Sequence, residues 1–472
     1  MDATALKPSL LRNILLLRLL SFAVLILALR FTYLVAARGR SCVSGNDFCF
    51  SPVRRVSPLP LKKSQRVIDY YSTVFQDLIL EGFLSPNSKS LCIGTLTGEE
   101  VYALKRIGVA DSIGISDNAS PPLILRGRPQ HQPFDDNIFD FEYSNSLDQS
   151  GGPVEFVSEI CRTLRPGGFV VVHTGAKDAY SLQSFLDLFN CCRLSRWREI
   201  EGSDPSSTGI REIVMKKEME KRHPYSGGRK CYVPGLKWEI IQNAEPLIKK
   251  EPLKPWITLK RNMKNTRYLT SMVDIRFKQR YVYIDVGARN YGSSIGSWFK
   301  KQYPKQGKRF EIFAIEADKA FRGEYKMKKG VKLVPYAAWI RNETLFLEIT
   351  RDPRGKEGKD RGRSRGRIHP VQTSTRYVGE AGKIEGFDFA EWLKMEVCDR
   401  DFVVMKMDVE GAEFHLIPRL METGAICMVD EVFLKCHYNR WRRSPKYHKT
   451  YAQCLQLFAS LRESGVLVHQ WW

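Results

Sequence analysis

The sequence lacks two short motifs that would point to metal or phosphate binding. It contains no Cys-x-x-Cys pair, and the adjacent Cys191 and Cys192 have no partners at zinc-finger spacing. It also contains no Gly-Lys-Ser or Gly-Lys-Thr phosphate loop. We therefore predict no metal site and exclude a P-loop nucleotide-binding protein.

Acidic residues are scarce relative to basic ones. The chain has 472 residues, with 74 Lys and Arg against 52 Asp and Glu, and a net charge of +22. Nearly all of this excess lies in residues 1–40, 216–280 and 351–368. Because the positive charge falls in a tail, a connector and a loop, it favours an anionic membrane or an acidic substrate over nucleic acid.

A long apolar segment lies near the N-terminus. Residues 13–37 are apolar except for Arg18, Arg30 and a few small polar residues, and this length can span a bilayer. We interpret it as an uncleaved signal anchor with the bulk of the chain in the lumen. A cleaved signal peptide ending at Ala37 and an organelle transit peptide are the alternatives.

Other features are compatible with a luminal chain. The 11 cysteines include Cys42 and Cys49, which are close enough for a small disulfide loop, although the odd total leaves one thiol without an internal partner. Asn118-Ala-Ser and Asn342-Glu-Thr are glycosylation sequons.

The length suggests two domains of ordinary size. We expect α/β architecture with two Rossmann-like domains, each a mostly parallel seven-stranded sheet flanked by helices, after the transmembrane helix. We predict a cytoplasmic tail at 1–12, the anchor at 13–37, a stalk at 38–63, a first domain at 64–215, a basic connector at 216–269, and a second domain at 270–472 with a mobile basic loop at 351–368.

Two segments of the second domain point to an adenosyl ligand. Residues 281–286 predict a strand that ends at Asp285, followed by Gly287 and Gly292 and then by a helix-compatible stretch. The next apolar run ends at Glu316, and an acid at the end of the second strand usually accepts hydrogen bonds from ribose hydroxyls. Because the turn has no phosphate-loop lysine, it suits an adenosyl ligand without phosphates.

A third segment carries a dense group of acids. Residues 402–407 predict a buried strand, and Asp408, Glu410 and Glu413 follow it within six residues. Acids are also favoured in the first turn of a helix by its dipole, so a purely structural role is the alternative.

These segments resemble the FkbM-type S-adenosyl-L-methionine-dependent methyltransferases. Five motifs occur in the family's order: Asp285-Val-Gly-Ala288, Ala314-Ile-Glu-Ala317, Tyr336-Ala-Ala338, Gly386-Phe-Asp-Phe389 and Lys406-Met-Asp-Val-Glu-Gly-Ala-Glu413. Two positions depart from the pattern: Arg289 is an apparent insertion in the first turn, and Lys435 occupies the acidic place of a Glu-x-His motif.

The resemblance implies the roles of individual residues. The cofactor S-adenosyl-L-methionine would bind at Asp285, Gly287, Ala288 and Gly292 of the turn, at Glu316, and at Asp408 on the methionine or substrate side. A sugar hydroxyl acceptor benefits from a general base, for which the candidates are Asp408, Glu431 and His437. Lys406 is expected to support Asp408.

The first domain resembles the common class I methyltransferases in a degenerate form. Residues 133–140 and 159–168 are similar to the later motifs of that class. However, Cys92, Leu96 and Ser116 stand where an acid, the middle glycine and a carboxylate are expected. Leu96 would crowd the cofactor. We expect this domain to serve mainly as a partner surface or a substrate-positioning module.

The complete pattern is similar to plant membrane-anchored methyltransferase-superfamily proteins. It predicts a single-pass type II Golgi membrane protein whose second domain methylates a hydroxyl of a glycan or polysaccharide, for which an acidic glycan is one candidate. The alternatives are a non-catalytic luminal scaffold built from retired methyltransferase domains and a nucleic-acid methyltransferase.

Overall fold

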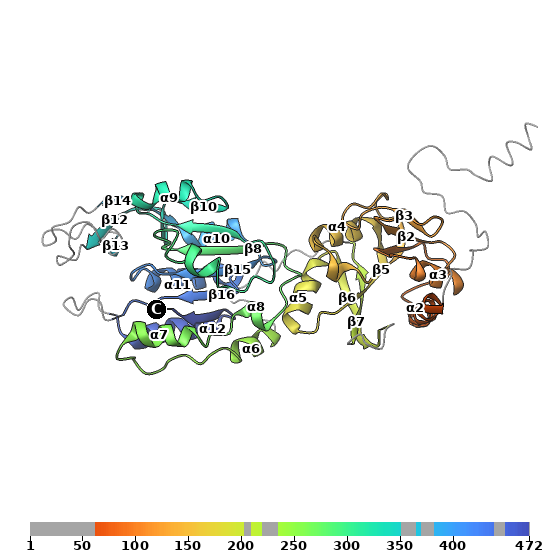
Figure 1. Cartoon of the computed structure of the whole chain (residues 1–472), viewed down its shortest axis with the longest axis horizontal. Coiled ribbons are helices and arrows are strands. Elements are labelled where there is room, and N and C mark those ends of the chain that lie inside the picture. The colour runs from red at the N-terminus through yellow and green to blue at the C-terminus, as the bar shows by residue number, and fades with distance from the viewer. Residues whose placement is uncertain are drawn as a thin grey trace, which may run out of the picture. The chain divides into compact units, whose positions relative to one another are not determined.

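The computed structural model describes residues 62–202, 209–219, 235–350, 365–369, 382–438 and 449–471 (Figure 1). The predicted tail, the anchor at 13–37, nearly all of the stalk and the Cys42–Cys49 pair lie outside these residues. Among the helices that are described, none has the length and apolar character needed to cross a membrane.

Two compact units make up the chain. One comprises Met1–Tyr143 and Arg162–Phe169, and the other comprises Ser144–Cys161 and Val170–Trp472. The elements up to residue 217 are α2 (Lys62–Leu80), β1 (Ser90–Ile93), α3 (Glu99–Arg106), β2 (Ser112–Ser116), β3 (Ile124–Arg126), β4 (Phe139–Ser144), η1 (Leu147–Gln149), α4 (Pro153–Thr163), β5 (Leu164–Thr174), α5 (Ala179–Leu188), β6 (Cys192–Ile200) and β7 (Ile210–Lys217).

The strands up to β7 form a seven-stranded sheet in the order β3-β2-β1-β4-β5-β7-β6. Strand β2 pairs in parallel with β1 and β3, whereas β6 and β7 are antiparallel. The runs predicted as strands at 90–94, 112–115 and 169–173 coincide with β1, β2 and β5. The prediction of a mostly parallel seven-stranded α/β sheet is confirmed here.

A second sheet has the order β10-β9-β8-β15-β16-β17, and all its strand pairs are parallel. Among the described residues this sheet has six strands, where seven were predicted. Its strands are β8 (Tyr281–Val286), β9 (Glu311–Ile315), β10 (Val331–Val334), β15 (Phe402–Met407), β16 (Glu431–Leu434) and β17 (Leu467–Gln470). The sequence order reverses direction between β8 and β15, so this pair is the topological switch point of the sheet.

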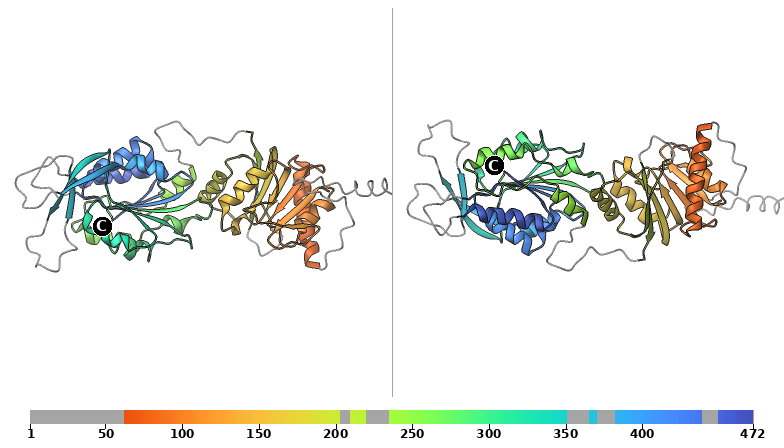
Figure 2. Two further views of the ribbon diagram at one scale, coloured as in Figure 1. Left: turned by 90° about the horizontal axis from the view of Figure 1, so that it is seen from above. Right: turned by 90° about the horizontal axis from the view of Figure 1, so that it is seen from below.

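Alternating residues of the second sheet face two separate apolar cores. Val282, Ile284 and Val286 of β8 belong to one core, and Tyr283 belongs to the other. Figure 2 shows helices on both faces of this sheet. The first core takes residues from α10 (Phe389–Glu396), α11 (Glu413–Glu422), η4 (Ala425–Met428) and α12 (Tyr451–Glu463), and the second from α7 (Pro255–Met263), α8 (Leu269–Met272), the short π-helix η2 (Ile295–Phe299) and α9 (Arg322–Lys326).

A small third sheet is inserted between β10 and β15. It has the order β11-β14-β12-β13 and consists of β11 (Ala337–Trp339), β12 (Glu343–Thr350), β13 (Arg365–His369) and β14 (Gly382–Asp388). The predicted mobile loop at 351–368 overlaps β13, so its last residues are part of a strand. Residues 351–364 lie outside the described residues.

Part of the predicted connector packs on the second sheet. It contains α6 (Gly235–Gln242) and α7, and the segment between them carries Glu245. The buried His469 of β17 bonds through Nδ1 to Glu245 and through Nε2 to Oε1 of Glu431 at 2.7 Å. Burial alone lowers the pKa of His469, but the bonds with Glu245 and Glu431 outweigh it and raise the pKa to about 9. The imidazolium therefore ties this segment to the edge of the sheet.

The His469 contacts predict a pH dependence of stability. The pKa is about 9 in the folded chain and about 6.5 in an unfolded one, so the contribution is complete below about pH 6.5 and is lost as the pH rises through 9. We expect the free energy of unfolding to fall by roughly 1–3 kcal/mol over this window. Urea denaturation of the full chain at several pH values measures it. His469→Gln should reduce the fall but not abolish it, because the pKa of the buried His437 is also raised to about 9. His131→Gln at an exposed site should leave the fall unchanged. Equal profiles for wild type and His469→Gln would contradict the assignment.

Candidate functional site

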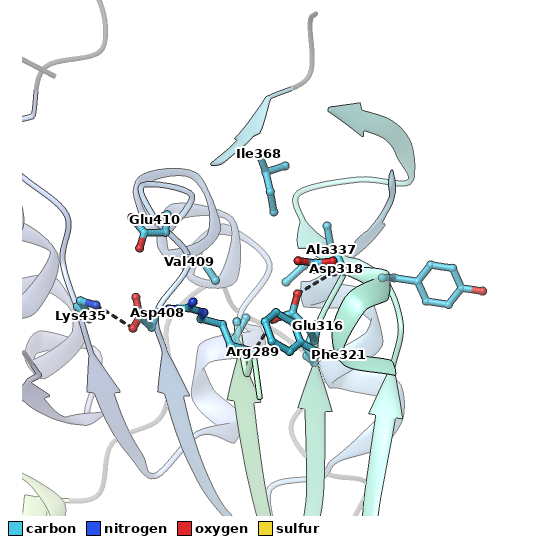
Figure 3. A pocket seen from close by; sticks show the side chains of 16 residues that line it. Arg289, Glu316, Asp318, Phe321, Ala337, Ile368, Asp408, Val409, Glu410 and Lys435 are labelled. Atoms are coloured by element: carbon cyan, nitrogen blue, oxygen red, sulfur yellow. Dashed lines mark hydrogen bonds and ion pairs between the residues drawn. The ribbon is translucent and has the colours of Figure 1, made fainter. Parts of the chain in front are cut away.

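A pocket lies at the carboxyl ends of the second sheet's strands, at the switch point between β8 and β15 (Figure 3). Ligands of open α/β sheets bind at this place because the two connections leave in opposite directions. The lining residues are Val286, Gly287, Arg289, Ile315, Glu316, Ala317, Asp318, Phe321, Tyr336, Ala337, Ala338, Ile368, Asp408, Val409, Glu410 and Lys435.

Gly287 allows two turns to approach each other below the pocket. Its φ is +77°, a conformation that L side chains rarely adopt. A Cβ at this position would overlap the carbonyl oxygen of Asp408 and would also crowd Val409. The turn after β8 therefore packs directly against the acidic turn after β15, which requires glycine for both conformation and space.

Glu316 is held by backbone donors at the end of β9. Its Oε2 accepts from the Arg289 N–H at 2.7 Å, and its Oε1 accepts from the Asp318 N–H at 2.7 Å. Burial raises the pKa of Glu316, although both backbone donors oppose the rise. Each carboxylate oxygen keeps a further lone pair, so the group is able to accept from ligand hydroxyls. Glu316 lines the pocket, and its role at a ribose stays a prediction.

Asp285 does not line the pocket. It is fully buried and lies 3.1 Å from Nζ of Lys406, its direct neighbour in the β8–β15 register, and it also accepts from the Ser294 hydroxyl. Lys406 donates its hydrogen bond to Asp285, and its charge also lowers the pKa of Asp408, so the expected support of Asp408 is electrostatic. Of the predicted turn residues, Gly287 lines the pocket and Asp285, Ala288 and Gly292 do not.

Asp408 is paired with the lysine that replaces the expected acid. Nζ of Lys435 lies 3.0 Å from Oδ2 of Asp408. The contact follows from the sheet, since Met407 pairs with Leu434 and the next residues are Asp408 and Lys435. Burial alone raises the pKa of Asp408, but the His437 contact and the nearby lysines hold it well below its usual range. Asp408 is therefore a stable anion and a weak general base.

His437 lies among three acids of the same turn. Its Nδ1 is 3.0 Å from Oε1 of Glu413, and its Nε2 is 3.2 Å from Oδ1 of Asp408 and 3.8 Å from Oε2 of Glu410. Burial alone lowers the pKa of His437, but Glu413 and Asp408 outweigh it and raise the pKa to about 9. An imidazole that is already protonated at neutral pH is not suited to the predicted role of general base.

Glu431 lies at the amino end of its strand, whereas the pocket lies at the carboxyl ends of the strands. It is the first residue of β16. Its carboxylate accepts from the Leu269 N–H at 2.9 Å and from the Tyr303 hydroxyl, and it also bonds to His469. The choice of Glu431 as a possible catalytic base was therefore wrong, since its contacts are structural.

Several pocket residues were not assigned a role from the sequence. Arg289 was noted only as an insertion and Lys435 only as a departure, yet the Arg289 side chain lies between Glu316 and Asp408 in Figure 3. Asp318 and Glu410 each follow a predicted site acid by two residues, a spacing that could have identified them. Ile368 comes from a stretch predicted as a loop, which carried no such indication.

The corresponding turn of the first unit is arranged differently. Cys92 is buried in β1, and Thr95 donates to Glu100 at the start of α3. A Cβ at Gly114 of β2 would overlap the methyl group of Thr95, so this side chain packs directly on β2. Leu96 was expected to crowd a cofactor, but its side chain is 77% exposed.

Family models match both halves of the chain. Residues 91–172 match a methyltransferase domain, and residues 241–345 and 366–472 match a domain of unknown function, DUF7870. The first match supports S-adenosyl-L-methionine as the cofactor, as predicted. It falls on the domain expected to be degenerate, whereas the domain that resembles FkbM enzymes matches DUF7870. No curated protein matches the chain.

Part of this chain is similar to solved methyltransferase structures. The 1,6-didemethyltoxoflavin-N1-methyltransferase of Burkholderia thailandensis, with bound S-adenosylhomocysteine, is 12% identical, covers 36% of this chain and 94% of its own, and has a TM-score of 0.27. A putative sarcosine dimethylglycine methyltransferase of Galdieria sulphuraria is 16% identical, with coverages of 33% and 86% and a TM-score of 0.24. A possible histamine N-methyltransferase of Thermotoga maritima is 15% identical, with coverages of 33% and 99% and a TM-score of 0.22.

The close approach at Gly287 predicts the effect of adding one methyl group. Gly287→Ala should lower the free energy of unfolding and also displace the acidic turn, because the new Cβ meets a backbone oxygen. Gly330→Ala is the matched control, since Gly330 has φ +76° with nothing within 4 Å of an added Cβ. Both variants carry a backbone strain of about 1 kcal/mol, and we expect Gly287→Ala to cost about 1–3 kcal/mol more in urea denaturation. Equal losses would show that the approach tolerates a side chain.

Proposed function

We propose that the second domain is an S-adenosyl-L-methionine-dependent O-methyltransferase that acts on a glycan or polysaccharide hydroxyl in the Golgi lumen, on a chain anchored by residues 13–37. The observation that carries this proposal is the pocket at the β8–β15 switch point, where Glu316 and Asp408 are both held in place on its wall. The resemblance to FkbM enzymes supports the same assignment.

The pocket residues fit an adenosyl ligand. Glu316 would accept from the ribose hydroxyls, and the apolar Ile315, Ala337 and Ala338 would lie against the adenine. Four carboxylates (Glu316, Asp318, Asp408 and Glu410) and two cations (Arg289 and Lys435) line the pocket, so its net charge is negative. That balance suits a ligand with a sulfonium and an ammonium group, whose carboxylate Arg289 would hold.

The residues of the pocket would act by positioning. When bound, S-adenosyl-L-methionine would supply a methyl group on sulfur: the acceptor oxygen would bond to that methyl as the carbon–sulfur bond breaks, S-adenosylhomocysteine would leave, and the hydroxyl proton would pass to solvent. Glu316 follows β9 and Asp408 follows β15, and the Gly287 turn after β8 contacts both strand ends: its N–H donates to Ile315, and its missing side chain admits Asp408. The two acids would therefore hold the two reactants in a fixed relation. Such alignment is a main source of rate in displacement reactions.

The charge of the sequence favours an anionic acceptor. Ile368 of β13 lines the pocket, and the residues before it in the sequence, 351–367, are strongly basic. Basic residues attract polyanions. We therefore propose an acidic glycan as the acceptor class.

Disulfides support the luminal location. Cys161 is bonded to Cys191, and Cys436 is bonded to Cys454. Disulfides persist in the secretory pathway and are rare in the cytosol. The second bridge joins the turn that carries His437 to α12, so oxidation also stabilises the wall of the site.

Calorimetric titration of the detergent-solubilised full chain with S-adenosylhomocysteine tests the cofactor assignment. We expect one binding event that Glu316→Ala weakens about tenfold or more, because hydrogen bonds to a charged group are lost. Ser116→Ala is the matched control at the same place in the first unit. Binding that is lost in Ser116→Ala but kept in Glu316→Ala would assign the cofactor site to the first unit. The absence of binding in the wild-type chain would contradict the proposed activity and favour the alternative of a non-catalytic scaffold.

Glycosylation in cells tests the location. Asn118 is exposed next to the end of β2, so a luminal chain should carry a glycan there. We expect an endoglycosidase-sensitive shift in gel mobility that Asn118→Gln reduces and that Asn87→Gln, at an exposed asparagine outside a sequon, leaves unchanged. A chain without any glycan at Asn118 or Asn342 would argue against the lumen.

A further inference from the structure

Two side chains of the pocket wall, Asp408 and Glu410, and the neighbouring His437 present ligand atoms to one another. Asp408, Glu410 and His437 each offer one atom, and these atoms lie within 4.8 Å of one another. Figure 3 shows Asp408 and Glu410 on the turn that follows β15. Two carboxylates and one imidazole form a donor set that divalent cations bind.

The imidazole of His437 gives a second, independent indication of a ligand site beside the two carboxylates. The side chain of His437 is 2% exposed, and Nε2 is buried without a hydrogen bond among the described residues. Nε2 nevertheless faces Oδ1 of Asp408 at 3.2 Å and Oε2 of Glu410 at 3.8 Å. A buried nitrogen directed at two carboxylate oxygens, with no hydrogen bond to either, has the position of a metal ligand.

The other ring nitrogen is held by a buried acid. Oε1 of Glu413 lies 3.0 Å from Nδ1 of His437 and also accepts from the backbone N–H of that residue at 2.6 Å. Oε2 of Glu413 accepts from the Gly411 N–H at 2.8 Å, so the carboxylate is fixed in its orientation. A bound cation would displace the Nε2 proton; with Nδ1–H donated to Glu413, the lone pair would then lie on Nε2. A metal-bound imidazole usually donates its other ring N–H to a carboxylate, which fixes the orientation of the ring.

Lys435 leaves one oxygen of Asp408 available. Its Nζ contacts Oδ2, whereas the oxygen that faces His437 is Oδ1. The lysine therefore orients the carboxylate from one side and does not occupy the point shared by the three ligand atoms.

We propose that Asp408, Glu410 and His437 bind a divalent cation such as Mn²⁺ or Zn²⁺ at the wall of the pocket. The remaining coordination positions would face the cavity, because Asp408 and Glu410 line it. The role of the ion rests on the proposed function: it would bind the acceptor hydroxyl and lower the pKa of that group as a Lewis acid.

Mn²⁺ titration of the full chain, followed by electron paramagnetic resonance, tests the site. We expect one tightly bound ion per chain whose pulsed spectra show nitrogen coupling from an imidazole. Glu410→Gln should weaken binding about tenfold or more, and Glu422→Gln, at an exposed acid at the end of α11, should not. Competition with Zn²⁺ and Mg²⁺ identifies the preferred ion.

Two results would overturn the inference. One is the absence of nitrogen coupling in the wild-type chain at about 1 mM Mn²⁺, a measurement that does not depend on any variant folding. The other is equal affinity in wild type and in a folded Glu410→Gln. S-adenosylhomocysteine is titrated into the same samples. A chain that binds S-adenosylhomocysteine but does not bind Mn²⁺ keeps the proposed function and loses the metal site. A chain that binds Mn²⁺ but does not bind S-adenosylhomocysteine keeps the metal site and loses the proposed function.

Discussion

The parallel pairing of β8 with β15 is the constraint on which the rest of the second domain depends. In this register Asp285 lies opposite Lys406, and the two turns that follow meet where Gly287 has no side chain. The pairing thus produces a buried ion pair between the two strands and a pocket at their carboxyl ends. A shift of one residue would place every side chain on the wrong face and would separate the ion pair, since side chains alternate along a strand.

The acids of this domain divide into those that maintain the structure and those that face the cavity. Asp285, Glu413 and Glu431 are fully buried, and each has fixed partners within the protein. Glu316 and Asp408 are held by comparable contacts but keep oxygens directed at the pocket. Buried charges need partners to offset desolvation, and such pairs maintain the structure. A carboxylate that fits a family motif is therefore not by itself a catalytic group.

Much of the architecture was predictable because it follows from local patterns. The apolar runs at 90–94, 281–286 and 402–407 predicted β1, β8 and β15, and their alternating faces account for the two cores. The number of strands in the second sheet was not predictable in this way, and neither was β13 within a basic stretch that has almost no apolar residues. Strand pairing with β12 decides that segment, and pairing is a long-range property.

The sequence alone determined that Gly287, Glu316 and Asp408 would meet at one edge of a sheet, because each follows a predicted strand and parallel strands end together. Only the tertiary structure decided which neighbours those groups have. It placed Lys435 rather than Lys406 beside Asp408, placed Glu431 at the amino end of its strand, and enclosed His437 between Glu413 and Asp408. Electrostatic environment depends on distances across the fold, and a pattern read along one chain carries no information about those distances.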